Sequence, residues 1–191
     1  MTLHDNLADE VLRRQTPEAQ SFLIQTSILD RLHGSLCDAV TGRSEGQSIL
    51  DVLAQEGSFV AREDDEWFVC RREFADVWRN RLFHTSFDLL PELHLRASAW
   101  YERNGFADEA IRHAMAAADY NRAARLIRDA APDRIARGDL RAALKWLGAL
   151  PDSVVQSDRG LCLLHARALS AAGYGDAAER RRWDAEQTGN G

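Results

Sequence analysis

The chain has 191 residues, which is long enough for one large domain or two small ones. Its hydrophobic content of 45% and charged content of 28% are ordinary for a globular protein and exclude wholesale disorder. The formal net charge of −6 argues against nucleic acid or an anionic membrane as the main partner, because both attract proteins with surplus Lys and Arg.

The three cysteines, Cys37, Cys70 and Cys162, lie far apart, and no Cys-x-x-Cys spacing occurs. This pattern favours buried free thiols in a reducing cytosol over a disulfide framework or a zinc site. Residues 1–6 lack the basic and apolar regions of a signal peptide, and no apolar run approaches membrane-spanning length. We therefore expect a cytoplasmic protein that does not bind membranes.

Short helices are expected in the first part of the chain. The first apolar stripe consists of Leu7, Val11 and Leu12. A capping hydroxyl at Thr16, followed by Pro17 and Glu18, marks the start of the next helix. Its apolar positions continue with Phe22, Leu23 and Thr26.

Two further helices are expected before residue 58. Ser35 should open a brief helix that Gly42 closes. Ser44 and Gln47 have the spacing of a capping box at the start of the following helix, and Gly57 should end it. The apolar residues of these two helices are Leu36, Cys37, Val40, Ile49, Leu50 and Leu53.

The pattern then changes to that of a β-hairpin. Residues 59–61 and 67–70 are short β-prone runs on either side of the acidic residues 63–66, which suit a turn. Helices followed by a two-stranded wing indicate a winged-helix-like domain, which we assign to residues 1–86.

From Glu73 the helical period returns and persists to the end of the chain. Its first two apolar stripes are typical of helices that pack in a core. Pro132 should break or kink one long segment, and residues 188–191 should be frayed. The stripes consist of Phe74, Val77, Trp78, Arg81 and Leu82, and of Leu90, Leu93, Ala97, Trp100 and Tyr101.

An internal repeat lies in the second half. Gly105, Gly138 and Gly173 are 33 and 35 residues apart, and each is followed five positions later by an alanine (Ala110, Ala143 and Ala178). These spacings match the period of about 34 residues in tetratricopeptide repeats. Glycine permits the left-handed turn that ends a helix, and alanine allows close packing of the next helix. The other turns should lie at residues 119–120 and 151–152. We therefore expect tetratricopeptide-like helical hairpins, an α-solenoid, over residues 87–191.

Three stretches resemble a known family. They are residues 7–12 with Arg14 and Gln15, residues 22–42, and residues 92–114. Together they make the chain similar, over nearly its whole length, to the large ATP-dependent LuxR-family regulators of the MalT type. In one place the chain departs from the family. Residues 68–74 replace a segment that commonly carries paired histidines, so contacts made by those histidines are not expected here.

The resemblance implies a bacterial regulator with four parts: an ATPase module, a winged-helix-like domain, a helical superhelix that receives signals, and a LuxR-type DNA-binding domain. This chain corresponds to the second part and the first repeats of the third. ATP is thereby implied only for a full-length parent, with no cofactor in this chain. The partner would be a protein or a small-molecule inducer that binds the helical repeats. The last repeat should leave an apolar face exposed, which would favour self-association.

No catalytic or nucleotide-binding motif is evident. The P-loop pattern GxxxxGK[ST] is absent, as are GxSxG and HExxH. Residues 173–178 match GxGxxA, but they follow an expected helix and coincide with the repeat turn, which favours a turn over a dinucleotide site. We assign no catalytic, cofactor-binding or metal residues and do not expect an enzyme.

Two clusters allow more than one interpretation. His113, four residues after Glu109, could belong to an acid–base pair, but a solvated ion pair is the favoured reading. Residues 180–182 are three arginines that could bind an anion; the flanking acids Glu179, Asp184 and Glu186 favour a mixed solvated face.

The winged-helix-like domain is not expected to bind DNA. The helix that would enter the major groove, residues 44–56, contains acids and no Lys or Arg, and the wing tip is acidic. The leading functional hypothesis is a signal-relaying segment of a transcriptional activator. A free-standing tetratricopeptide-like adaptor is the alternative, and a small enzyme is third.

Overall fold

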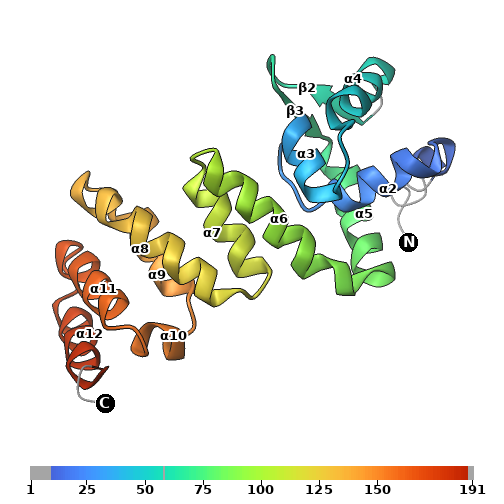
Figure 1. Ribbon diagram of the computed structural model, residues 1–191. Coiled ribbons are helices and arrows are strands. Elements are labelled where there is room, and N and C mark those ends of the chain that lie inside the picture. Colours follow the sequence, from blue (N-terminus) through green and yellow to red (C-terminus); the bar gives the residue numbers. More distant parts are fainter. Residues whose placement is uncertain (1–9, 58, 189–191) are drawn as a thin grey trace. The chain divides into compact units, whose positions relative to one another are not determined.

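The computed structural model describes residues 10–57 and 59–188, so His4, Leu7 and residues 189–191 lie outside the described residues. The expected fold class is confirmed: the chain is mainly helical, with a small antiparallel sheet among the first helices and helical hairpins after it (Figure 1). Two compact units divide at residue 100, within a helix. The sequence places a boundary at residue 86, which stays a prediction.

Unit 1 contains α2 to α5 and a sheet, and α6 begins in it. Thr16 caps α2 as expected, because its Oγ1 accepts a hydrogen bond from Ala19 N, and Phe22, Leu23 and Thr26 are buried. Residues 10–14 are also helical. The helices are α2 (Pro17–Thr26), α3 (Gly34–Thr41), α4 (Gly46–Glu56), α5 (Arg72–Thr85) and, after the 3-10 turn η1 (Phe87–Leu89), α6 (Leu90–Arg103).

The sheet has the order β1-β3-β2, and all neighbouring strands are antiparallel. The predicted hairpin is confirmed as β2 (Val60–Arg62) and β3 (Trp67–Cys70). A third strand, β1 (Leu32–His33), pairs with β3 and was not predicted, since two residues carry too short a pattern to recognise. The wing is therefore anchored to the chain segment that precedes α3.

Two predicted helix starts differ in the structure, for different reasons. At α3 the cap is His33, whose Nδ1 accepts from Ser35 N at 3.2 Å, and Ser35 lies within the helix. At α4 the Ser44–Gln47 capping box does not form. Instead Asp38 Oδ1, from α3, accepts from Gly46 N at 2.7 Å. A partner eight residues away replaces the local one, whereas the predicted ends at Gly42 and Gly57 are confirmed by their left-handed backbones.

The core of unit 1 is aromatic at its centre. Phe59, from the segment before β2, lies edge-on to Trp78 of α5 at 5.2 Å and next to Phe74 at 5.8 Å. These rings link the sheet to α5. The other large side chains fully buried in this unit are Leu12, Phe22, Leu23, Leu36, Leu50, Leu53, Phe68 and Leu82.

Unit 2 is built of helices that follow one another as antiparallel pairs (Figure 1). Asp119, Asp139 and Asp158 cap three of them by accepting backbone hydrogen bonds, and the turn expected at residues 119–120 is confirmed. After α6 the helices are α7 (Ala107–Ala116), α8 (Tyr120–Ala136), α9 (Leu140–Ala149), the short α10 (Asp152–Gln156), α11 (Arg159–Ala171) and α12 (Gly175–Thr188).

The three repeat glycines occupy equivalent turns, as predicted. Gly105, Gly138 and Gly173 have φ of 81°, 79° and 85°, and each follows the last helical residues of α6, α8 or α11. After each glycine, the next N–H bonds back to a carbonyl five residues earlier, at 2.8–2.9 Å, which is the Schellman pattern. The alanines five positions after the glycines, Ala110, Ala143 and Ala178, are all fully buried.

Pro132 does not break a helix, so that part of the prediction is wrong. It lies inside α8, which runs as one helix from Tyr120 to Ala136. A proline there removes only the bond that its own N–H would give to the carbonyl of Arg128. Ile127 and Ala131 before Pro132 and Ile135 after it are buried, which holds the helix against its neighbours on both sides of the proline.

Candidate functional site

The wing of unit 1, which consists of β2, β3 and the turn between them, carries acids that pair with Arg31 and accept hydrogen bonds from the turn backbone. Arg31 Nε lies 2.5 Å from Glu63 Oε2, and Arg31 Nη2 lies 3.4 Å from Asp64. The Asp64 carboxylate also accepts hydrogen bonds from the backbone N–H groups of Glu66 and Trp67, which lower its pKa, with the charge of Arg31 adding to the effect. The wing tip is therefore anionic at neutral pH.

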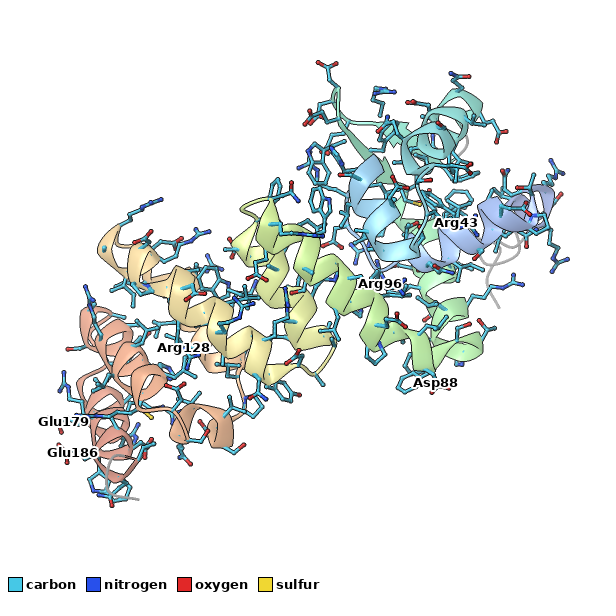
Figure 2. The ribbon with its side chains drawn as sticks, in the orientation of Figure 1. Arg43, Asp88, Arg96, Arg128, Glu179 and Glu186 are labelled. Atoms are coloured by element: carbon cyan, nitrogen blue, oxygen red, sulfur yellow. The ribbon has the colours of Figure 1, made fainter. Side chains whose placement is uncertain are left out.

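Several arginines of unit 1 contact acids or a backbone carbonyl of the same unit. Arg62 of β2 forms an ion pair with Asp51 of α4 and lies over the ring of Phe68 at 4.5 Å. Arg72 lies 3.6 Å from Asp76. Figure 2 shows Arg43 after α3 and Arg96 on α6, and Arg96 donates to the carbonyl of Val40 and pairs with Glu92. Arg62 and Arg96 are therefore engaged in contacts within unit 1.

His33 and His113, two of the described histidines, contact aromatic rings. His33 lies between Trp67 and Trp100, with ring centroids 5.2 and 5.4 Å away, and serves as the α3 cap. The predicted ion pair of His113 is wrong, because His113 is fully buried and stacks on Tyr101 at 5.4 Å. Amphipathic spacing alone did not identify it as a core residue, since Ala107–Ala116 carries both charged and apolar faces.

The cysteines are unreactive. Cys37 and Cys162 are buried and Cys70 is partly buried, and none forms a disulfide. Burial raises the pKa of Cys37 and of Cys70 to about 12 and raises that of Cys162. All three thiols are protonated at neutral pH, so none is a nucleophile there.

A hollow in unit 2 is the best-formed candidate site among the described residues. It has a volume of about 510 Å³ and lies between α10, α11 and α12. Its polar wall is centred on Arg181, which forms ion pairs with Asp152 of α10 and with Asp184 one turn along α12. Arg181 pairs with Asp184, one of the flanking acids, but its side chain is mostly buried and not part of a solvated face. The lining residues are Asp152, Gln156, His165, Leu169, Ala177, Arg180, Arg181, Trp183 and Asp184.

Sequence reasoning did not find this hollow. Its residues come from three helices and extend from Asp152 to Asp184, with no fixed spacing that a motif could capture. The one local signal was the trio of arginines at residues 180–182 beside acids. Among residues 10–57 and 59–188, no three His, Cys, Asp or Glu side chains cluster as a metal site would require. Within the same residues, no helix is long and apolar enough to cross a membrane.

Comparison with known proteins places these features in a family. Residues 8–89 match the family described as the MalT winged helix domain. The chain is 34% identical over 177 residues to the HTH-type transcriptional regulator MalT of Yersinia enterocolitica, a match that covers 91% of this chain and 20% of that protein. It is also 34% identical over 157 residues to the serine/threonine-protein kinase PknK of Mycobacterium tuberculosis, covering 81% of this chain and 14% of the kinase.

The chain thus spans a fifth or less of the length of these relatives. The matched residues 8–89 contain α2 to α5 and the whole sheet, so the family match and the winged-helix architecture of unit 1 agree. The match to MalT extends beyond this domain over most of the helical repeats. Residues 8–89 therefore correspond to the MalT winged helix domain, and the chain as a whole is similar to a middle segment of MalT-type regulators that also carries helical repeats.

Proposed function

We propose that the chain is the regulatory segment of a MalT-type transcriptional activator, relaying a signal between other modules without hydrolysing ATP or reading DNA itself. The observation that supports this most directly is the charge on unit 1. Helix α4, in the place of a recognition helix, carries Asp51 and Glu56 with no Lys or Arg, and residues 63–66 at the wing tip are all acids. Such a surface repels phosphates, so the winged fold would serve as a protein-docking domain.

The relatives support a regulatory role over a catalytic one. Similar segments occur in a protein named as a transcriptional regulator and in one named as a kinase. Kinase activity is named for one of these relatives and transcriptional regulation for the other. A signal-handling segment attached to different output modules fits both. ATP hydrolysis and DNA recognition would then belong to other parts of the parent protein.

The helical repeats would receive the signal. Repeats of this kind present extended surfaces on which a protein or a small-molecule inducer can bind. The hollow between α10, α11 and α12 supports a small-molecule signal, because its volume of about 510 Å³ falls within the range of ligand sites. The winged-helix unit, continuous with the repeats through α6, would pass the signal on.

The coding sequence on either side of this segment separates the alternatives. A P-loop upstream and a LuxR-type helix-turn-helix downstream would support the activator. A kinase domain upstream would instead make the chain the regulatory segment of a kinase. An open reading frame limited to these 191 residues would favour a free-standing adaptor and overturn the proposal.

A DNA titration tests the non-reading role of unit 1 directly. Fluorescence anisotropy of labelled duplex DNA is measured against the chain at about 50 and about 200 mM salt. We expect no micromolar binding at either salt concentration. Reversing two wing charges, Asp65→Lys with Glu66→Lys, should create weak, salt-sensitive binding, whereas Asp64 is left unchanged because its carboxylate holds the turn. Micromolar binding by the wild-type chain that weakens steeply with salt would refute the proposed role.

A further inference from the structure

The hollow between α10, α11 and α12 contains a polar group that the fold buries without a partner. His165 of α11 is 7% exposed, and its Nδ1 has no hydrogen-bond partner among the described residues. Buried polar atoms in native proteins are nearly always hydrogen-bonded, so an exception that lines a hollow indicates a place for a bound group. Burial lowers the pKa of His165, and Arg181 lowers it further while Asp152 opposes them. The ring is therefore neutral at pH 7 and can exchange one hydrogen bond with a hydroxyl or N–H group.

The two arginines that line the hollow have different roles. Arg181 is mostly buried and committed to Asp152 and Asp184, so it forms a fixed part of the wall. Arg180 is exposed and makes no ion pair or hydrogen bond with any residue in the described part of the chain. Glu179 and Glu186 point outward from α12 in Figure 2 and are exposed. The hollow thus offers one guanidinium that is free to bind a carboxylate in the bidentate mode.

An aromatic wall completes the site. Trp183 is 62% exposed, and its indole lines both this hollow and a second one of about 350 Å³, which shares Gln156 and Asp184 with the first. Leu169 of α11 and Ala177 of α12 supply apolar surface. An exposed indole next to aliphatic side chains favours a planar apolar body.

We propose that this hollow binds a small aromatic carboxylate that also carries a hydroxyl or N–H group. Its carboxylate would pair with Arg180, its ring would pack between Trp183 and Leu169, and its hydroxyl or N–H would bond to His165. The proposal rests on the proposed function, in which the repeats receive the signal, and names the chemistry of that signal. It concerns residues 152–184 alone, so the DNA titration and the flanking sequence test the broader role independently.

Calorimetric titration with 4-hydroxyphenylacetate tests the class of ligand. A ligand of this size should bind with a Kd of about 0.1–1 mM. Two matched probes separate the contributions: 4-hydroxyphenylacetamide lacks the charge, and acetate lacks the ring. We expect the carboxylate to bind about tenfold more tightly than the amide, and acetate not to bind below about 10 mM. Equal affinity for carboxylate and amide, or no binding of either, would overturn the proposal.

Variants locate the site. Arg180→Gln should remove the preference for the carboxylate over the amide, whereas Arg182→Gln, at an exposed position two residues along α12, should leave it unchanged. Both changes are on the surface, so folding is not at risk, and circular dichroism verifies it. In the wild-type chain, the ¹⁵N signals of the His165 ring should move on titration while those of the exposed His84 stay fixed. Equal effects of the two arginine variants, or an unmoved His165 signal, would place the ligand elsewhere and refute the assignment.

Discussion

The repeat turns of unit 2 allow a clean test of what the glycines contribute. Gly138 has a φ of 79°, and a Cβ atom added there would meet no atom within 4 Å. Any cost of Gly138→Ala therefore comes from the left-handed backbone and not from a clash. For a residue with a side chain this conformation costs about 1–2 kcal/mol in the free energy of unfolding.

Gly148 provides the matched control. It lies within α9, where its backbone is helical, and an added Cβ again meets nothing within 4 Å. Alanine there should stabilise the helix by about 0.5–1 kcal/mol, because glycine loses more conformational freedom on folding. The same chemical change, ten residues apart, is thus expected to have opposite signs.

Thermal unfolding followed by circular dichroism measures both variants. Unit 2 spans residues 101–191, and in a unit of this size 1 kcal/mol shifts Tm by about 4–8 °C. Gly138→Ala should lower the Tm of unit 2 by about 4–16 °C, and Gly148→Ala should raise it by about 2–8 °C. If the two variants melt together, or if Gly148→Ala is the less stable, the glycine turn does not define the repeat.

Two further predictions concern the interior of unit 2. Ala143→Leu should destabilise the chain by about 1–3 kcal/mol, because Ala143 is fully buried and α9 packs against both α8 and α11. Ala149→Leu, at an exposed position of the same helix, should change the stability little. Equal melting temperatures of the two variants would show that Ala143 does not set the helix spacing. The pKa of His165 in the folded chain is below its ordinary value of 6.5, so the unfolded chain takes up the proton first as the pH falls. The contribution of His165 to stability is therefore complete above about pH 6.5 and declines below it. Between pH 7 and pH 5, the Tm of the wild-type chain should fall more than that of His165→Gln. Parallel pH profiles for the two proteins would refute this.

The features that the sequence predicted correctly are the ones that depend on a few neighbouring residues. Thr16 before Pro17 makes a cap within three residues, and Gly105, Gly138 and Gly173 each define their own turn. The wing is also local, because two β-prone runs meet across a short acidic turn.

Three of the errors involve partners that local patterns do not contain. Asp38 caps α4 across eight residues, β1 pairs with β3 across more than thirty, and Tyr101 takes His113 into the core from another helix. Local patterns carry no information about such partners. The hollow in unit 2 could not be predicted for the same reason, since its wall depends on Asp152 of α10 meeting Arg181 of α12.

The short helix α10 connects the repeat geometry to the candidate ligand site. The loops before α7 and α9 pass directly from glycine turn to helix, but α10 is an additional turn of helix between α9 and α11. Its Asp152 pairs with Arg181, and Thr188 of α12 donates to the carbonyl of Gln156 at its end, so α10 is held to α12 at both ends. In a regular repeat, α11 and α12 would pack together without an additional helix such as α10. One wall of the hollow is formed by α10, and the other walls are formed by α11 and α12. The additional helix α10 therefore creates the hollow beside two helices that otherwise pack closely through Ala178.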